Sequence, residues 1–360
     1  MQRFVAYDEV VDVIAQGRTR ATVRLHSGMQ VDLRLVPQVS YGAALHYFTG
    51  SKAHNIAVRR IAMDRGLKLN EYGVFKDEKR IAGRTEQEIF AAVGLPYIEP
   101  EMRENRGEIE AARQDRLPLL VCGKDIRGDL HCHTKASDGH DSLEEMAGAA
   151  RAKGYEYLAV SDHSRRVTVA HGLDATRLAQ QIDAIDRLNE TLEGLVLLKA
   201  CEVDNLDNGK LDLPDSIIAR LDLTVSAVHY KFALSRQRQT ERILRAMDNP
   251  NFNVLAHPTG RLINQRNPYE VDLERLMRAA RENGCFMELN AHPDRLDLTD
   301  EACLMAREIG LKVAISTDAH STSSLDFMRF GIDQARRGWL SANDVLNTRS
   351  LKALRRLLRR

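Results

Sequence analysis

The stretch DLHCHTKASDGH, residues 129–140, follows a short apolar segment and places two histidines one residue apart. Residues i and i+2 of a β-strand point to the same face, so His131 and His133 would lie side by side. Two protonated imidazoles at that spacing repel each other, whereas a metal ion binds both in their neutral form. The stretch therefore predicts a strand that ends at a metal site, with further ligands supplied by the rest of the chain.

The composition is that of a folded globular protein, with 43% hydrophobic and 29% charged residues in 360. The net charge of +1 gives no support of its own for a nucleic-acid or membrane partner. The five cysteines form no C-x-x-C pair, which argues against disulfides and a thiolate zinc site and suits a reducing cytosol. Without a signal-peptide pattern or an apolar run of roughly 18 residues, we expect a cytoplasmic protein without a membrane span.

From about residue 126 the chain alternates apolar segments with amphipathic ones. The apolar segments predict seven strands, at residues 126–133, 155–163, 195–204, 221–229, 252–258, 285–290 and 311–320. Between them, helical patterns lie at residues 142–154, 174–194, 238–249, 272–284 and 300–310. Ser142 and Glu145 form the capping box that starts the first of these helices. This alternation predicts an α/β fold with a parallel sheet, open or closed.

Histidines and carboxylates gather where these strands end, although a single histidine there would more often be structural. Six of the chain's 12 histidines and two carboxylates end predicted strands: His131, His133, His163, Glu202, His229, His257, Asp318 and His320. The carboxyl ends of parallel strands share one crevice, so these side chains should converge. Such a set is too large for one ion and predicts two or three, bridged by Glu202 from a central strand. Ligands without sulfur suit Zn, Mn or Fe, and paired ions can activate water for phosphate hydrolysis. Cys132 and Cys201 should pack in the wall.

The motifs at residues 129–139, 161–163, 201–204, 227–232, 256–261 and 316–320 resemble, in order, those of the PHP (polymerase and histidinol phosphatase) domain. The resemblance implies a distorted barrel of seven strands that binds up to three ions. It implies nine metal ligands: His131, His133, Asp138, His163, Glu202, His229, His257, Asp318 and His320. Among them it implies Glu202, His133 and Asp318 as the catalytic residues. One ion would lie among His131, His133, Glu202 and Asp318, a second among Glu202, His229 and His257, and a third among Asp138, His163 and His320.

Four further residues beside these motifs are candidates for contact with substrate. Arg261 and Lys231 suit phosphate, and Phe232 suits a stacked base, although the ring could equally belong to the core. Arg266 could equally be solvated. His292, near the end of the sixth strand, is an extra histidine that we expect at the surface rather than at substrate.

Residues 31–75 resemble the end of the palm and the thumb of family X DNA polymerases, most recognisably at YFTGS, residues 47–51. The resemblance makes Asp32 a metal-binding carboxylate and assigns nucleotide or DNA contacts to Tyr47, Phe48, Gly50, Asn55 and Arg59. The family's phosphate loop and paired carboxylates would lie upstream, so the chain would be a fragment or the product of a truncated gene. Asp8 and Asp12, four apart in a segment that we expect to be helical, do not replace them. Nucleotidyl transfer needs several converging carboxylates, and we therefore expect no polymerase activity.

We divide the chain into a palm-end and thumb-like region at 1–100, a charged linker at 101–122, a PHP barrel at 123–345 and a basic helix at 346–360. The overall prediction is an α/β barrel of PHP type preceded by a small α+β domain. The basic carboxyl-terminal helix is expected to be a surface helix rather than a grip on DNA.

This layout resembles that of the bacterial family X polymerase/exonucleases, and it implies a Mn²⁺-dependent 3′–5′ exonuclease or phosphoesterase that acts on DNA. Zn²⁺ or Fe are alternatives to Mn²⁺. The main alternative function is a phosphatase of the histidinol-phosphate type, which shares the PHP motifs. An amidohydrolase and a non-catalytic DNA-binding module fit less well, the first because eight strands are expected and the second because every ligand is present. The oligomeric state is left open.

Overall fold

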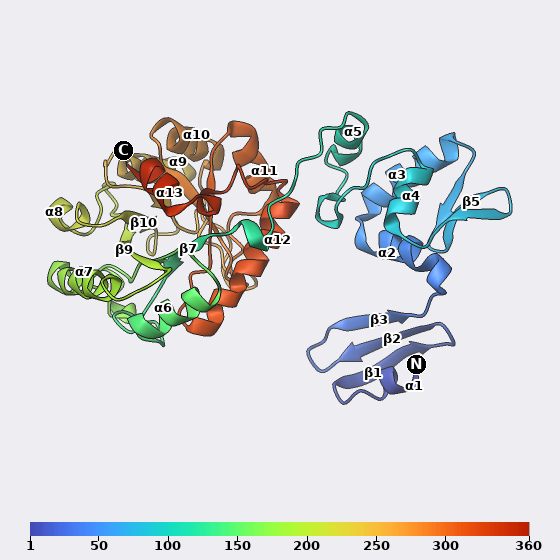
Figure 1. Ribbon diagram of the computed structural model, residues 1–360, viewed down its shortest axis with the longest axis horizontal. Coiled ribbons are helices and arrows are strands. Elements are labelled where there is room, and N and C mark those ends of the chain that lie inside the picture. The colour runs from blue at the N-terminus through green and yellow to red at the C-terminus, as the bar shows by residue number, and fades with distance from the viewer. Residues whose placement is uncertain (360) are drawn as a thin grey trace. The chain divides into compact units, whose positions relative to one another are not determined.

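The structure is a computed structural model that describes residues 1–359, and the chain divides into two compact units between Leu117 and Pro118 (Figure 1). No helix among the described residues is long and apolar enough to cross a membrane.

The first unit begins with a short helix, α1 (Gln2–Val5), and an antiparallel sheet of β1 (Val10–Gln16), β2 (Arg20–Leu25) and β3 (Gln30–Arg34). The helical reading of the segment around Asp8 and Asp12 is wrong, because Asp12 lies on strand β1 opposite Arg24. The sequence VVDVIAQ is rich in β-branched residues, which favour a strand.

The rest of the first unit combines helices with a second small sheet. The helices are α2 (Tyr41–Thr49), α3 (Lys52–Asp64) and α4 (Glu86–Ala92), and the strands are β4 (Lys68–Asn70), β5 (Gly73–Lys76) and β6 (Lys79–Ala82). The helix expected at 51–65 is present, and the Ser51 side chain caps it by accepting a hydrogen bond from the His54 backbone N–H. Buried Val58, Val74 and Ile89 belong to the core of this unit.

The segment predicted as a linker, residues 101–122, is folded over most of its length. It contains η2 (Pro100–Met102) and α5 (Glu108–Arg113), and the first compact unit extends to Leu117. Two of its charged side chains are buried rather than solvated: Arg103 is fully buried and paired with Glu86, and Glu108 Oε1 lies 2.6 Å from His54 Nδ1. Composition suggested solvent exposure here because it does not reveal the partners that allow charges to be buried.

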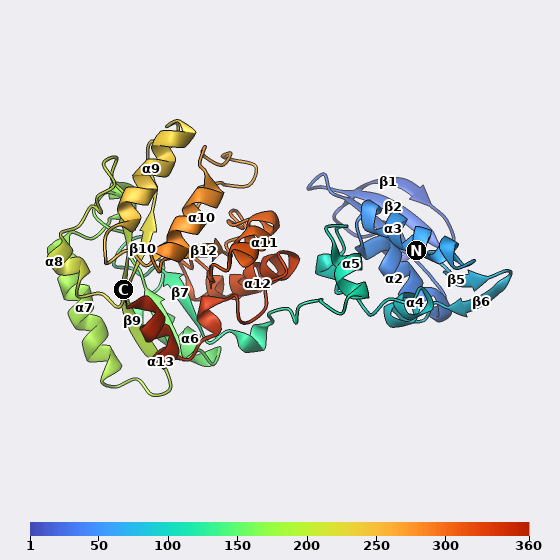
Figure 2. The ribbon, with the colours of Figure 1, turned by 90° about the horizontal axis from the view of Figure 1, so that it is seen from above.

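The second unit is built on seven parallel strands, as predicted, and the strands lie in sequential order (Figures 1 and 2). They are β7 (Gly128–Cys132), β8 (Tyr157–Val160), β9 (Val196–Asp204), β10 (Leu223–Ala227), β11 (Val254–Leu255), β12 (Phe286–Asn290) and β13 (Val313–Ser316). A parallel bridge between Cys132 and Ala319, with the His133 N–H donating to the Ala319 carbonyl at 2.8 Å, joins the last strand to the first. The sheet therefore closes as a distorted seven-stranded barrel.

Helices surround these strands (Figure 2). They are α6 (Leu143–Ala152), α7 (Ala175–Asn189), α8 (Asp215–Ile218), α9 (Arg236–Met247), α10 (Leu273–Glu282), α11 (Asp300–Ile309) and α12 (Met328–Arg337). The capping box predicted for α6 is present, with Ser142 and Glu145 each bonding the other's backbone N–H. Short 3-10 turns lie at η1 (Gln38–Ser40), η3 (Gly123–Asp125), η4 (Thr168–Ala170), η5 (Thr322–Phe327) and η6 (Leu346–Thr348).

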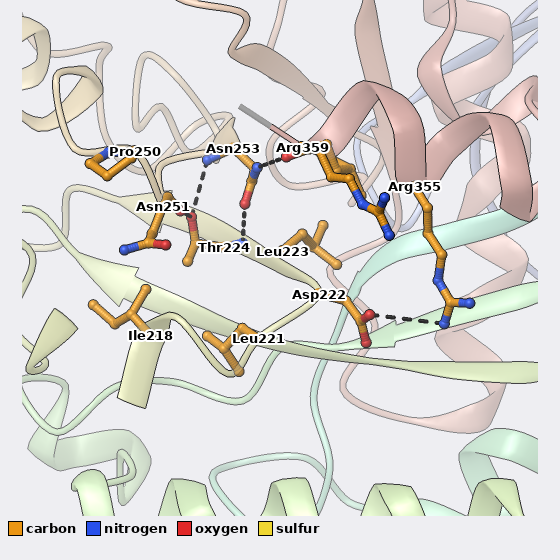
Figure 3. Close-up of a pocket in the computed structure, with 11 residues that line it drawn as sticks. Ile218, Leu221, Asp222, Leu223, Thr224, Pro250, Asn251, Asn253, Arg355 and Arg359 are labelled. Carbon is orange, nitrogen blue, oxygen red and sulfur yellow. Dashed lines mark hydrogen bonds and ion pairs between the residues drawn. The ribbon is translucent and has the colours of Figure 1, made fainter. Parts of the chain in front are cut away.

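The carboxyl-terminal helix α13 (Leu351–Leu358) packs by Leu354 and Leu358 at the start of strand β10. Its Arg355 lies 3.9 Å from Asp222 at the edge of a cavity of about 450 Å³ (Figure 3). Leu223 and Thr224, which open strand β10, line this cavity. The helix thus covers the amino ends of the strands, opposite the end where the histidines gather.

Candidate metal centre

Glu202, on strand β9, lies at the centre of the histidines that end the barrel strands. Its Oε1 lies 2.8 Å from His257 Nε2 and 3.3 Å from His229 Nε2. Its Oε2 lies 2.8 Å from His163 Nδ1 and 3.5 Å from His131 Nε2. One buried carboxylate thus faces imidazoles from four other strand ends, which is the arrangement expected of a bridging ligand.

Two further groups form around His133, which lies just after strand β7. On one side His133 Nε2 lies 3.1 Å from Asp318 Oδ1 and 3.1 Å from His131 Nε2. On the other side Asp138 Oδ2 lies 3.5 Å from both His163 Nε2 and His320 Nε2. The structure brings all nine predicted ligands together at the carboxyl end of the barrel, with His133 between the two groups.

The electrostatics of the cluster favour a bound cation. Burial alone would raise the pKa of Glu202, but the imidazoles of His163 and His229 hold it well below its ordinary value. His131 similarly keeps the pKa of Asp318 low against the effect of burial. Conversely, burial would lower the pKa of His163, but Glu202 and Asp138 together outweigh it and raise that pKa to about 10. The carboxylates are therefore anionic, and positive charge must be present beside them as protons or as metal ions.

The donor atoms fit divalent metal ions. Atoms that ligate one ion at about 2.0–2.2 Å lie about 3.0–3.6 Å apart, close to the separations in this cluster. His133 Nδ1 is also buried without a hydrogen-bond partner, and His163 Nδ1 and Glu202 Oε2, although 2.8 Å apart, are not aligned for a hydrogen bond and have no other partner. Buried polar atoms are nearly always satisfied, so unpartnered donor atoms that converge mark a place for an ion.

Three residues absent from the predicted site hold these ligands in place. Glu288, buried in strand β12, places Oε1 2.7 Å from His131 Nδ1 and accepts a hydrogen bond from the His257 backbone N–H at 2.7 Å. Asn290 donates to Asp318 Oδ2 at 3.0 Å, and Asp204 Oδ1 lies 3.3 Å from His229 Nδ1. Carboxylates that orient metal-binding histidines in this way fix the ring and its tautomer. A glutamate inside the buried strand FMELN was the sequence signal, since a buried carboxylate needs a partner.

The loop that carries Asp138 depends on Asp162, which is buried. Asp162 accepts hydrogen bonds from the Thr134 backbone N–H at 2.8 Å and from the Thr134 hydroxyl at 2.7 Å. The neighbouring Gln181 of helix α7 also donates to Asp162.

The two ligands His257 and Asp318 adopt positive φ angles of 26° and 54°, which are uncommon for residues other than glycine and cluster at functional sites.

Arg295 is a further residue that sequence reasoning missed. Its Nε lies 3.4 Å from Asp318 Oδ2, and its Nη1 is buried without a hydrogen-bond partner. Arg261, the arginine predicted to contact phosphate, instead donates to the backbone carbonyls of Arg295, at 2.7 Å, and Leu296. Arg261 therefore holds the turn, and Arg295 presents the guanidinium beside the cluster.

The other predicted substrate residues of the barrel are engaged within it. Lys231 pairs with Asp207, and Phe232 stacks on Tyr269 with ring centroids 6.1 Å apart. Arg266 lies over the Phe232 ring at 4.2 Å. His292 is half-buried rather than at the surface, with its ring edge-on to Phe327. The two cysteines Cys132 and Cys201 are fully buried, as expected.

In the first unit, Asp32 is an isolated carboxylate that pairs with Thr22 and, at 3.6 Å, with Arg20. No metal-ligating group found among the described residues includes it. The predicted nucleotide-facing residues lie together: Asn55 donates to the carbonyls of Tyr47 at 3.0 Å and Gly50 at 3.1 Å. Arg59 lies over the Tyr47 ring at 5.0 Å, and Phe48 is exposed.

The fold and the site define a PHP metal-binding barrel joined to a polymerase-type thumb, and comparisons with known proteins agree. Residues 129–292 match the PHP domain family, and residues 44–104 match the DNA polymerase beta thumb. A protein of Acetivibrio thermocellus named "Probable phosphatase" is 32% identical over 203 residues, which cover 53% of this chain and 78% of that protein.

Over its whole length the chain is 41% identical to DNA polymerase/3′-5′ exonuclease PolX of Bacillus subtilis, and it spans 63% of that relative. The crystal structure of histidinol phosphate phosphatase from Lactococcus lactis, complexed with zinc, L-histidinol and phosphate, matches with a TM-score of 0.42. That match is 16% identical and covers 58% of this chain and 94% of the other. The chain belongs to the PHP family and carries a sequence that matches the DNA polymerase beta thumb ahead of its PHP domain.

Proposed function

We propose that the chain is a metal-dependent phosphodiesterase that removes nucleotides from the 3′ ends of DNA. We propose that it acts in the cytoplasm and functions in DNA repair. The observation that carries this proposal is the convergence of four imidazoles on the buried carboxylate of Glu202. The thumb match and the relative named as a DNA polymerase/3′-5′ exonuclease support DNA as the substrate.

The nine predicted ligands would hold two to three divalent ions, with Mn²⁺ as the activating metal and Zn²⁺ or Fe as alternatives. When bound, such ions supply Lewis acidity, which makes water a nucleophile at neutral pH and neutralises charge on phosphate oxygens. Within the chain, Glu202 and Asp318 are anionic, so they can hold the cations beside which the attacking water would lie. Hydrolysis breaks the bond between phosphorus and the 3′ oxygen, and that oxygen takes up a proton as it leaves.

Arg295 would hold the substrate phosphate. Its guanidinium is a fixed cation beside Asp318, and a buried donor without a partner gains most from an anionic acceptor. His133 belongs to both ligand groups, so its loss should disturb both. Polymerase activity is not part of this proposal, because no metal-ligating group among residues 1–359 includes Asp32.

A phosphatase of the histidinol-phosphate type remains the second candidate, favoured by the relatives named as probable phosphatases. The two are separated by assaying a 3′-labelled single-stranded oligonucleotide and histidinol phosphate with Mn²⁺. We expect the oligonucleotide to be degraded from its 3′ end, and His133→Ala to lose at least about 100-fold in rate. His140→Ala, which changes an exposed histidine, is the matched control and should leave the rate unchanged. Hydrolysis of histidinol phosphate alone would replace the nuclease proposal.

A further inference from the structure

A cavity of about 670 Å³ lies beside the candidate metal centre, and none of the predicted substrate residues lines it. Its walls are the loop at 165–169, the segment that carries Asp204, Leu206 and Asp212, and the pair His229 and Tyr230. His229 belongs to both places, because its Nε2 lies 3.3 Å from Glu202 Oε1. A ligand in the cavity would therefore adjoin whatever lies at the metal centre.

One wall of the cavity is a planar stack. The guanidinium of Arg166 lies over the ring of Tyr230, with Cζ 3.8 Å from the ring centroid. Tyr230 is fixed from within by buried Arg242, which also contacts the ring and donates to the Tyr230 carbonyl at 3.0 Å. Arg166 itself is exposed, as is the neighbouring Val169, which is 91% exposed. A guanidinium plane held in this way is a surface on which nucleobases stack.

The cavity is also lined by two buried carboxylates, Asp204 and Asp212, and one oxygen of each has no hydrogen-bond partner. Asp204 is 0% and Asp212 4% exposed, and Oδ2 of Asp204 and Oδ1 of Asp212 accept no hydrogen bond. A buried acceptor left unsatisfied is destabilising, and a ligand that donates N–H or O–H groups would remove that loss. The same carboxylates repel phosphate, so the cavity suits a planar, neutral, hydrogen-bond-donating ligand.

We propose that this cavity binds the nucleoside, base and sugar, of a nucleotide whose phosphate lies at the candidate metal centre. Arg166 stacks on the base, and Asp204 and Asp212 accept hydrogen bonds from the nucleoside. A volume of about 670 Å³ lies within the range of about 300–1,000 Å³ usual for small-ligand sites. The inference rests on the proposed function for the role of the phosphate. It adds that the site selects nucleotides over other phosphoesters by binding the nucleoside.

The test compares two substrates that share phosphate and leaving group, namely thymidine 5′-(p-nitrophenyl phosphate) and methyl p-nitrophenyl phosphate, with Mn²⁺. We expect the wild type to show a KM at least about tenfold lower for the nucleoside ester. Arg166→Ala should raise the KM for the nucleoside ester about five- to tenfold and change that for the methyl ester less than twofold. Arg166→Lys should not restore the preference, because it keeps the charge and loses the plane. Arg187→Ala, an exposed arginine of helix α7, is the matched control.

A binding measurement makes the outcome independent of turnover. Titration calorimetry with thymidine 5′-monophosphate and with 2-deoxyribose 5-phosphate should show a preference for the nucleotide that Arg166→Ala removes. If neither ester is hydrolysed but this preference is present, the proposed function fails and the inference stands. If both esters are hydrolysed equally and the two ligands bind equally, the inference is overturned and the proposed function survives. Rescue by Arg166→Lys would also overturn it, because the contact would then be one of charge alone.

Discussion

The Nε of Arg261 donates a hydrogen bond to the backbone carbonyl of Arg295 at 2.7 Å, so one arginine fixes the turn that presents the other. Arg261 also donates to the Leu296 carbonyl, and Leu296 has a positive φ of 43° that needs such support. The two arginines should therefore differ in what their loss does, although both lie close to the predicted ligands.

Replacing Arg295 by glutamine should lower kcat/KM for methyl p-nitrophenyl phosphate by about 10- to 100-fold, the worth of a charge-assisted hydrogen bond of about 1.5–3 kcal/mol. Arg295→Lys should recover part of the loss, and metal content should not change. Arg261→Gln should cost less and should not be rescued by Arg261→Lys, because lysine cannot make both bonds to the turn. Arg278→Gln, which changes an exposed arginine paired with Glu274, is the control. An Arg295→Gln variant with wild-type activity would show that the phosphate lies elsewhere.

Glu202 should determine how many ions the barrel holds. Because both of its oxygens face imidazoles, Glu202→Ala should lose more than one equivalent of metal after saturation with Mn²⁺ and desalting. Inductively coupled plasma mass spectrometry measures the content, with Glu274→Gln, an exposed carboxylate of helix α10, as the control. Loss of a single equivalent would mean that Glu202 serves one ion and does not bridge.

The parts of the site that could be predicted were those that depend on residues close together in the sequence. Strands and their ends follow from local patterns, and a histidine pair such as His131 and His133 is a local pattern too. Glu288 and Arg295 were missed because their importance lies in contacts with residues distant in the sequence, His131 and Asp318. Arg261 was overvalued for the same reason, since nothing local shows that its donors are taken by a backbone turn.

The first unit shows that composition alone does not predict which charged residues are buried. Residues 101–117 look like a solvated linker because they are charged, yet Arg103 and Glu108 are buried against partners many residues earlier. Conversely, the segment around Asp8 and Asp12 was expected to be helical, although the β-branched residues of VVDVIAQ, residues 10–16, favour the strand that forms there.

Template-directed nucleotide addition should be absent. Asp32 pairs with Thr22 and Arg20 and faces no second carboxylate in any metal-ligating group among residues 1–359. A primer-extension assay with Mg²⁺ or Mn²⁺ should show no added nucleotide, using an exonuclease-inactive His133→Ala background so that degradation does not hide synthesis. Extension that Asp32→Ala abolishes would contradict this prediction.

The first unit should lose stability as the pH falls below neutrality, because of His46. Its ring is buried with Nε2 unpartnered, and its centroid lies 5.2 Å from that of Phe90. Burial and the nearby charge of Arg103 lower its pKa to about 3. The unfolded chain takes up the proton near pH 6.5 and the folded chain does not, so stability is complete above pH 6.5 and falls continuously towards pH 3.

The loss should be about 1.4 kcal/mol, or tenfold in the unfolding equilibrium, for each pH unit below 6.5. His46→Phe keeps the aromatic contact and removes the titrating group, so it should abolish this dependence between pH 7.5 and 5. Hydrogen exchange of peptides from helix α4 in the full chain reports it, with wild type and variant compared at the same pH. At pH 5.5 we expect about tenfold greater protection in His46→Phe than in wild type, relative to their ratio at pH 7.5. The exposed His26, changed to glutamine, should leave the wild-type profile intact. Equal profiles for wild type and His46→Phe would show that another group governs the acid response.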